Sequence, residues 1–306
     1  MVTFSIITVC YNNFHGLNQT IHSVISQVFD NYEFIIIDGG STDGSLELLN
    51  EHNNEITYWC SEKDRGIYHA MNKGIDRASG EYVIFMNSGD VFHDKEVLQK
   101  ISSYAGNADL ISGYSLTADT HNRTHPHEGN LLHVLMYSSL SHQATFIRRE
   151  LLLKYKYDEK YRIASDWKFW LQALLFEHCS LEFVDVVVAI QDMTGITTGQ
   201  DSRIAQDKER EHILIELFPS ILSGADFSNR DLIVQRSLQL VQDRMHCAVM
   251  LKNRRQFYNT YKELKKYRRE DVIRYLGKGN RFLLLFKTNY NTIRLFLFLR
   301  GWLKGY

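Results

Sequence analysis

Short apolar runs alternate with helical patterns through the first hundred residues, and this alternation restricts the fold more than any other feature of the sequence. Uninterrupted runs rich in β-branched and aromatic residues predict strands at residues 4–9, 33–38, 56–60 and 82–86. Apolar residues at helical spacing predict helices at residues 17–28, 46–49 and 67–78. Because strands that are apolar on both sides need helices on both faces, we expect an α/β fold with a mainly parallel central sheet.

A polar cluster follows each of these four predicted strands. Tyr11 and Asn12 follow the first, Asp38 closes the second, residues 62–64 follow the third, and residues 87–90 follow the fourth. Ligands of open α/β sheets bind beyond the carboxyl ends of the strands. We therefore expect these clusters to form one binding site.

Two of the strand-end acids have roles that the residues alone leave open. Asp90 ends a short Asn-Ser-Gly-Asp loop, where one carboxylate suits Mg²⁺ or Mn²⁺ shared with a diphosphate, or else belongs to an ordinary turn. Asp38 precedes two glycines and either binds a ribose hydroxyl or caps the next helix.

Charge is unevenly distributed along the chain, although the net charge is only −1. Residues 1–251 carry 20 Lys and Arg against 33 Asp and Glu, whereas residues 252–306 carry 15 against 3. The acidic body argues against a nucleic-acid partner, since it would repel phosphate backbones. The basic, aromatic residues 281–306 suit the surface of an anionic membrane, and the alternative is a C-terminal helix packed on the domain.

Four blocks of sequence occur in a fixed order and carry a resemblance to a known family. They read SIITVCYN from Ser5, IIDGGSTDG from Ile36, DRGIYHAMNKGI from Asp64 and NSGD from Asn87. Together they resemble the donor half of family-2 glycosyltransferases of the GT-A fold, especially bacterial exopolysaccharide and O-antigen enzymes of the colanic-acid type. The resemblance covers residues 3–200. It implies inverting transfer of one sugar from a nucleotide-sugar, with a UDP-sugar favoured, to a lipid-linked or oligosaccharide acceptor.

The resemblance also implies roles for individual residues in the donor site. Thr8 and Tyr11 would border the base and ribose, Asp38 would lie against the nucleoside, and Asp64 would lie near the ribose or sugar. Four further residues of the matching blocks are expected at the donor: Asn12, Asn72, Asn87 and Ser88. Asp90 matches the last acid of the metal-binding Asp-x-Asp, whose first position here is Ser88. One protein carboxylate is thus expected to bind the Mg²⁺ or Mn²⁺.

Further along the chain, two segments resemble the acceptor side of the family. Residues 141–144 match the acceptor segment, so His142 and Gln143, together with Trp167, are expected to contact the acceptor. Ser165 and Asp166 align with the Glu-Asp motif of the catalytic base, and Asp166 matches the base itself. Ser165 is also expected to cap a helix over residues 167–176 and to place Asp166 in its first turn. The alternatives are plain helix capping for Asp166 and a partly buried structural role for His142.

These expectations define a domain organisation. Residues 1–220 form a GT-A catalytic domain with a donor half (1–100) and an acceptor half (101–220), and residues 221–306 form a basic helical extension. No apolar run reaches the roughly 18 residues of a spanning helix, so we expect a cytoplasmic enzyme held peripherally at the cytoplasmic face of the inner membrane. The alternative function is a non-catalytic nucleotide-sugar-binding scaffold, because Ser88 and Ser165 stand where the family has acids.

Overall fold

The computed structural model describes residues 2–118, 123–124, 139–175, 177, 179–193 and part of 202–217. The chain divides into two units, Met1–Glu216 and Leu217–Tyr306. The predicted helical extension at 221–306 and the predicted membrane-binding segment at 281–306 lie outside the described residues and stay predictions. In the described part of the chain, no helix is both long enough and apolar enough to cross a bilayer.

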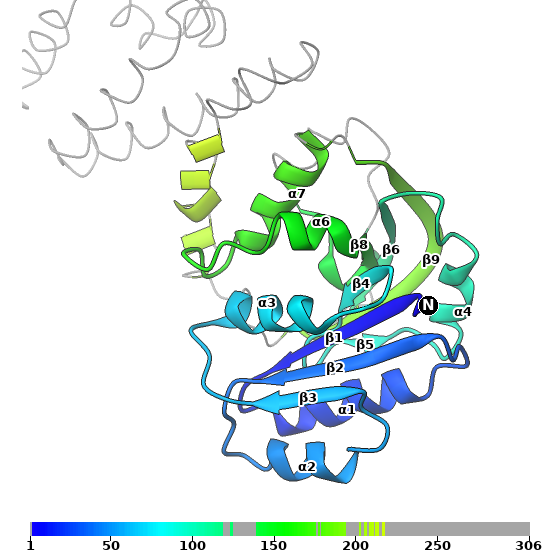
Figure 1. Ribbon diagram of the computed structural model, residues 1–306, viewed down its shortest axis with the longest axis vertical. Coiled ribbons are helices and arrows are strands. Elements are labelled where there is room, and N and C mark those ends of the chain that lie inside the picture. The colour runs from blue at the N-terminus through cyan, green and yellow to red at the C-terminus, as the bar shows by residue number, and fades with distance from the viewer. Residues whose placement is uncertain are drawn as a thin grey trace, which may run out of the picture. The chain divides into compact units, whose positions relative to one another are not determined.

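A single mixed sheet forms the centre of the first unit (Figure 1). Its strands run in the order β3-β2-β1-β4-β8-β6-β9-β5, and β7 pairs with β6. The strands are β1 (Phe4–Cys10), β2 (Tyr32–Asp38), β3 (Tyr58–Ser61), β4 (Tyr82–Phe85), β5 (Val91–Phe92), β6 (Leu110–Thr117), β7 (Arg123–Thr124), β8 (Thr145–Arg148) and β9 (Leu181–Gln191). The predicted α/β fold is confirmed.

The first four strands pair in parallel, as predicted. The rest of the sheet is mixed, because β8 is antiparallel to both β4 and β6, and β5 is antiparallel to β9, while β6 and β9 are parallel. Parallel neighbours need long crossover connections, usually helical. The sequence beyond residue 90 lacks the regular strand–helix alternation that provides them.

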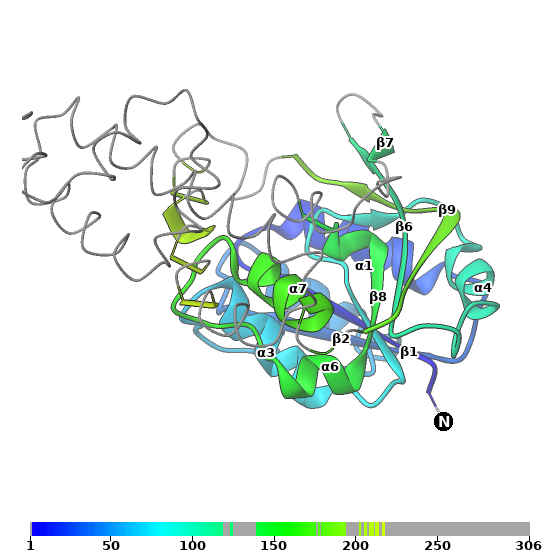
Figure 2. The same ribbon diagram turned by 90° about the horizontal axis from the view of Figure 1, so that it is seen from above.

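Helices cover both faces of the sheet, as the sequence predicts. The helices are α1 (Phe14–Ile25), α2 (Ser45–Glu51), α3 (Ile67–Arg77), α4 (Val97–Ser102), α6 (Arg149–Lys154) and α7 (Ser165–Leu175), with a short 3-10 turn η1 (His142–Ala144). Helices α1 and α2 lie on one face, and α3, α6 and α7 lie on the other (Figures 1 and 2). A Cβ on Gly74 of α3 would lie 2.5 Å from Cγ2 of Ile7, so this glycine lets α3 pack closely on β1.

The register of the parallel strands brings their carboxyl ends to one edge. Cys10 at the end of β1 pairs with Asp38, and Asp38 pairs with Ser61 at the end of β3. The loop after β4 joins the same edge, since the Ser88 amide donates to the carbonyl of Val9 at 3.1 Å. β1 is buried along its whole length, so the strand that leads to this edge of the sheet is closely packed in the core.

Candidate active site

The Asp38 carboxylate orders the loop that follows β2. It is fully buried and accepts hydrogen bonds from the amides of Gly40 (3.1 Å) and Ser41 (2.9 Å) and from the hydroxyl of Ser61 (2.6 Å). Its other oxygen accepts the hydroxyl of Ser41. Because both oxygens are bonded inside the protein, Asp38 shapes the loop, and its expected contact with the nucleoside stays a prediction.

Thr8 and Asn12 also fix the backbone around the site. Thr8 is fully buried, and its hydroxyl donates to the carbonyl of Met86 at 2.6 Å, joining β1 to the end of β4. Asn12 adopts a positive φ of 50°, and its Oδ1 accepts the amide of Thr42 at 2.9 Å. Asn12 therefore connects the loop after β1 to the loop after β2. The side chains of Asn12 and Thr8 thus hold the backbone of the site in place through these hydrogen bonds.

Tyr11 and Asp64 both lie close to Gly39, on the side where a Cβ would stand. A Cβ on Gly39 would lie 3.2 Å from Cδ2 of Tyr11 and 3.4 Å from Oδ2 of Asp64. The Tyr11 side chain is 67% exposed, so most of its ring is open to solvent. An aromatic ring and a carboxylate separated by bare backbone form a surface on which a flat base and a ribose can lie.

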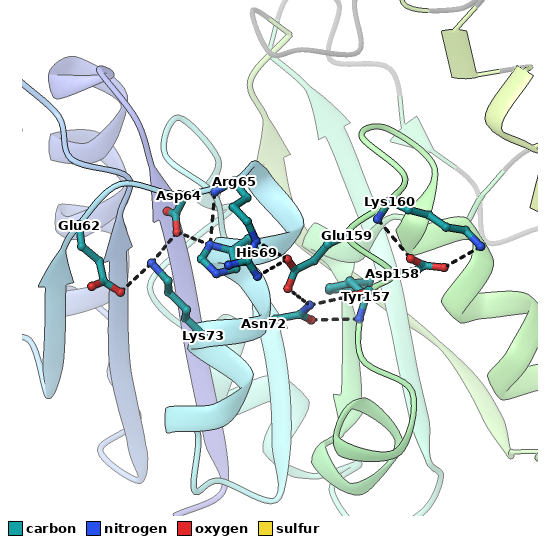
Figure 3. A network of polar contacts seen from close by, with 10 residues as sticks. All are labelled: Glu62, Asp64, Arg65, His69, Asn72, Lys73, Tyr157, Asp158, Glu159 and Lys160. Atoms are coloured by element: carbon teal, nitrogen blue, oxygen red, sulfur yellow. Dashed lines mark hydrogen bonds and ion pairs between the residues drawn. The ribbon is translucent and has the colours of Figure 1, made fainter.

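Asp64 belongs to a network of charged side chains on α3 and the loop before it (Figure 3). Its Oδ1 lies 2.6 Å from Nζ of Lys73 and 2.9 Å from Nδ1 of His69, and Lys73 also contacts Glu62 at 2.8 Å. These contacts hold the carboxylate of Asp64 at the sheet edge with only 10% of the side chain exposed.

Asn72 joins the donor half to the acceptor half. Its Nδ2 donates to the carbonyl of Tyr157 at 2.9 Å, and its Oδ1 accepts the amide of Tyr157 at 3.0 Å (Figure 3). Arg65 reinforces the connection through an ion pair with Glu159 at 2.6 Å. Asn72 is buried and both ends of its amide are bonded to Tyr157, so it connects the two halves, and its expected contact with the donor stays a prediction.

The loop after β4 brings Ser88 and Asp90 to the same edge. Nδ2 of Asn13 donates to the carbonyl of Ser88 at 3.0 Å and to its hydroxyl at 3.3 Å. Asp90 is only 4% exposed, and its Oδ1 accepts the amide of Asp192 at 2.9 Å. Burial, helped by the nearby charge of Asp192, raises the pKa of Asp90 to about 6, although His142, Gln143 and the Asp192 amide oppose this rise.

Asp192, directly after β9, supplies a second carboxylate beside Asp90. Its Oδ2 would lie 2.6 Å from a Cβ on Gly89, which places the carboxylate against the loop that carries Asp90. Sequence reasoning missed Asp192, and its only signal was an acid at the end of an apolar strand. Among the described residues, no three His, Cys, Asp or Glu side chains converge on one point. Mg²⁺ is commonly bound by one or two carboxylates together with phosphate oxygens of a substrate, and two neighbouring acids suit that arrangement.

Asp166 lies in the first turn of α7, as predicted, between two polar neighbours. The Tyr68 hydroxyl donates to its Oδ1 at 3.0 Å, and Nδ1 of His142 lies 3.7 Å from its Oδ2. Burial alone would raise the pKa of Asp166, but the contacts with His142, the Trp167 amide and Tyr68 outweigh it and lower that pKa. Asp166 is thus ionised at neutral pH, as a carboxylate base must be.

The expectation that Ser165 caps α7 is wrong. The helix begins at Ser165 itself, whose hydroxyl has no hydrogen-bond partner within the described part of the protein. The Glu209 carboxylate accepts the amides of Arg162 (2.8 Å), Ile163 (2.8 Å) and Ala164 (2.9 Å). These amides precede the helix, so an acid more than forty residues away along the chain orders the turn that leads into α7.

The turn η1 connects the two acids of the site. Nε2 of His142 lies 3.2 Å from Nδ2 of Asn87, while its Nδ1 faces Asp166. The next residue, Gln143, hydrogen bonds with Asp90. The structure therefore brings His142, Gln143 and Asn87 together between Asp90 and Asp166.

Trp167 does not join this group. Its side chain is 1% exposed and packs against the guanidinium of Arg210, whose Cζ lies 5.1 Å from the ring centroid. A residue after Asp166 on a helix points away from the face that Asp166 occupies. The expected acceptor contact of Trp167 is corrected to a role in the core.

The chain is similar in sequence and in fold to known glycosyltransferases. The chain is 29% identical over 199 residues to a PGL/p-HBAD biosynthesis glycosyltransferase of Mycobacterium bovis (strain BCG / Pasteur 1173P2), covering 63% of this chain and 77% of the relative. Its fold is similar to that of S. aureus TarS 1–349, with a TM-score of 0.67, 18% identity and coverage of 88% and 83% of the two chains. The mannosyltransferase PcManGT of Pyrobaculum calidifontis gives a TM-score of 0.54, 14% identity and coverage of 87% and 81%.

Residues 5–164 match the family described as Glycosyl transferase family 2. This match spans more than half of the chain, and it includes all four sheet-edge loops as well as η1. The chain therefore belongs to glycosyl transferase family 2 and is a glycosyltransferase.

Proposed function

We propose that this glycosyltransferase transfers one sugar from a nucleoside-diphosphate sugar to a hydroxyl of a lipid-linked or oligosaccharide acceptor, with inversion at the anomeric carbon, in the synthesis of a bacterial surface glycan. One observation carries the proposal. A carboxylate held as a base, Asp166, and a carboxylate suited to a cation, Asp90, lie on the two sides of η1. The relative from Mycobacterium bovis, named for PGL/p-HBAD biosynthesis, supports a glycan or glycolipid product.

The base and the leaving group act on opposite sides of the sugar. Asp166 takes the proton of the acceptor hydroxyl as its oxygen attacks C1, and the bond between C1 and the diphosphate breaks with its electron pair going to the phosphate. His142 lies 3.7 Å from Asp166, where it orients the acceptor hydroxyl. Attack from the side opposite to the leaving group inverts C1.

Asp90 and Asp192 would hold Mg²⁺ or Mn²⁺ together with the diphosphate. The fit rests on two neighbouring carboxylates, one of them almost fully buried, and oxygen ligands are those that these cations prefer. A bound cation would neutralise the charge that develops on the departing diphosphate. Asp192 would also supply the second acid that Ser88 does not provide in the Asp-x-Asp position.

The donor would lie along the edge formed by Tyr11, Gly39 and Asp64. The open ring of Tyr11 would stack on the base, and Asp64 would accept a ribose or sugar hydroxyl. TarS was determined with UDP-GlcNAc, and PcManGT with GDP-Man and Mn²⁺, which supports a nucleotide-sugar donor and leaves a UDP-sugar as our choice. Asn87 and Ser88 would flank the diphosphate.

The basic C-terminal residues would hold the enzyme at an anionic membrane, where lipid-linked acceptors lie. Reversing the charge of Lys287 and Arg294 to Glu should release the full-length chain from liposomes that contain an anionic lipid. Unchanged sedimentation with those liposomes would remove the membrane from the proposal.

The donor site is tested by a thermal-shift panel of UDP, GDP, TDP and CMP, each with and without Mn²⁺. A ligand at 100 times its dissociation constant stabilises the protein by about 2.7 kcal/mol. We expect a Mn²⁺-dependent rise in Tm with one base, lost in Asp90→Asn and kept in Asp94→Asn, whose half-buried carboxylate pairs with Lys100 at 2.9 Å. Binding without turnover of the matching nucleotide-sugar would favour the scaffold instead, and no shift with any nucleotide would refute the donor site.

A further inference from the structure

The Tyr68 hydroxyl points at the candidate base from the opposite half of the domain. It donates to Oδ1 of Asp166 at 3.0 Å and shares this contact with the carbonyl of Ile163 at 2.7 Å. We propose that Tyr68 is a positioning residue of the transfer reaction, which fixes Oδ1 of Asp166 and leaves Oδ2 to receive the acceptor proton. This inference rests on the proposed function, because it assumes that Asp166 is the base.

The structure fixes the Tyr68 side chain rigidly. The residue is buried, and its ring packs on that of Tyr157 with the centroids 5.2 Å apart. Its helix, α3, is held against β1 by the close approach at Gly74. The hydroxyl is thereby placed by the core of the sheet, and α3 is the same helix that carries the donor-side residues His69 and Lys73.

The two oxygens of Asp166 have different surroundings. Oδ1 has a hydrogen bond from Tyr68 at 3.0 Å, whereas Nδ1 of His142 lies 3.7 Å from Oδ2, and the Trp167 amide also bonds to the carboxylate. An acceptor hydroxyl can therefore approach Oδ2 from the side of His142. In the step, the acceptor O–H bond breaks, its proton goes to Oδ2, the oxygen bonds to C1, and the diphosphate leaves with the electron pair.

Tyr68 keeps its own proton during this step. Burial and the negative charge of Asp166 hold the pKa of Tyr68 well above its usual value. The phenol thus remains a hydrogen-bond donor over the working pH range and does not compete as a base. Its contribution is to place the carboxylate and to keep it ionised, because its hydrogen bond lowers the pKa of Asp166.

Tyr157 provides a matched control in the same aromatic cluster. It is as deeply buried as Tyr68, and its hydroxyl has no hydrogen-bond partner among the described residues. Tyr157→Phe removes a hydroxyl near Asp166 without removing a bond to it. Tyr68→Phe removes a hydroxyl of the same kind together with its bonds to Oδ1 of Asp166 and to the carbonyl of Ile163, and only the first of these bonds acts on the pKa of Asp166.

The experiment compares the pH profiles of kcat for the wild-type protein, Tyr68→Phe and Tyr157→Phe. The reaction is release of nucleoside diphosphate from the donor chosen by the nucleotide panel, with water or an octyl glycoside as acceptor and saturating Mn²⁺. Among the described residues, three ionisable groups face Asp166: Tyr68 from α3, His142 from η1 and Tyr157 from the loop before α7. Only the first is altered in the test variant.

For Tyr68→Phe we expect kcat to fall about 10- to 100-fold with the donor KM unchanged. The acid limb should move up by about one pH unit, because a carboxylate that loses a donor is harder to ionise. Tyr157→Phe should match the wild-type profile. A fall in kcat with an unmoved acid limb, or the same profile in both variants, would reduce Tyr68 to a packing residue and overturn the proposal.

Two further measurements keep the outcome decisive. If Tyr68→Phe does not fold, 3-fluorotyrosine can replace Tyr68. It keeps the ring and makes the phenol a stronger hydrogen-bond donor, so the acid limb of the pH profile should move to lower pH. An unmoved acid limb would refute the proposal.

Asp166→Asn separates the role of Tyr68 from the role of Asp166 as the base. Full turnover in Asp166→Asn would refute the proposed base, whereas lost turnover in Asp166→Asn together with a wild-type profile in Tyr68→Phe would refute the role of Tyr68 alone.

Discussion

The carboxylate of Asp192 lies directly against the backbone of Gly89, so that a Cβ at position 89 would meet its Oδ2 at 2.6 Å. Gly89 also has a φ of +104°, which side-chain-bearing residues rarely adopt. The glycine thus permits both the turn before Asp90 and the approach of a second acid to it. This relationship connects residues from two distant strands, β4 and β9, at the proposed cation site.

Gly89→Ala should therefore damage cation binding as well as stability. Backbone strain should lower the free energy of unfolding by about 1–3 kcal/mol, and the displaced Asp192 should abolish the rise in Tm that Mn²⁺ and nucleotide produce. Gly106→Ala is the matched control, since Gly106 has a φ of +91° and no atom within 4 Å of an added Cβ. If both variants lose stability equally and both keep the Mn²⁺-dependent shift, Asp192 is not part of the cation site.

The connection between α3 and the acceptor half depends on a buried amide and not on the exposed ion pair beside it. Asn72→Ala leaves the amide and carbonyl of Tyr157 without their partners, which should cost about 2–4 kcal/mol in urea unfolding. Arg65→Ala breaks an ion pair whose arginine side chain is 70% exposed, and it should cost less than about 1 kcal/mol. The reverse order of these two losses would show that the ion pair holds the halves together.

Glu33 should make stability depend on pH in the acid range. Burial alone would raise its pKa, but hydrogen bonds from Ser5, Ser79 and Gly80 outweigh this effect and hold the pKa below its usual value of 4.5. Because the folded pKa lies below the unfolded one, the stabilisation is complete above the unfolded value and is lost as the pH falls through the folded one.

Glu33→Gln tests this expectation. At neutral pH the variant should lose about 2 kcal/mol of unfolding free energy, and the gap to the wild-type protein should narrow below about pH 4. Glu51→Gln, a change at an exposed site of α2, should stay within about 0.5 kcal/mol at both pH values. If the difference in unfolding free energy between the wild-type protein and Glu33→Gln stayed constant across this pH range, the pKa of Glu33 would be the same in the folded and unfolded states.

The strands of the donor half could be predicted because they are continuous apolar runs, and β1 at Phe4–Cys10 differs from its prediction by one residue. Helix α1 begins and ends three residues earlier than the predicted range of 17–28, for a physical reason. The apolar pattern begins at Leu17, but Asn13 caps the helix by accepting the amide of Gly16, so it starts at Phe14. It ends at Ile25 because the amide of Val28 bonds to the carbonyl of Lys95 across the fold.

The position of the site could also be predicted, since polar strand ends of a parallel sheet must meet. The function of each residue within it could not, because the deciding partners are remote. The Tyr68 hydroxyl bonds to Asp166, 98 residues away, and Asp90 accepts the amide of Asp192, 102 residues away. The Asp38 carboxylate accepts a hydrogen bond from Ser61 on another strand, and no local sequence pattern predicts this contact.

The most direct test of the account is turnover by Asp166→Asn, measured as nucleoside diphosphate release together with donor affinity. We predict that release falls about 100- to 10,000-fold, while the Kd for the donor stays within about twofold of the wild-type value, because in the proposed reaction Asp166 acts on the acceptor hydroxyl. Wild-type turnover in this variant would contradict the assignment of Asp166 as the base and, with it, the proposed reaction.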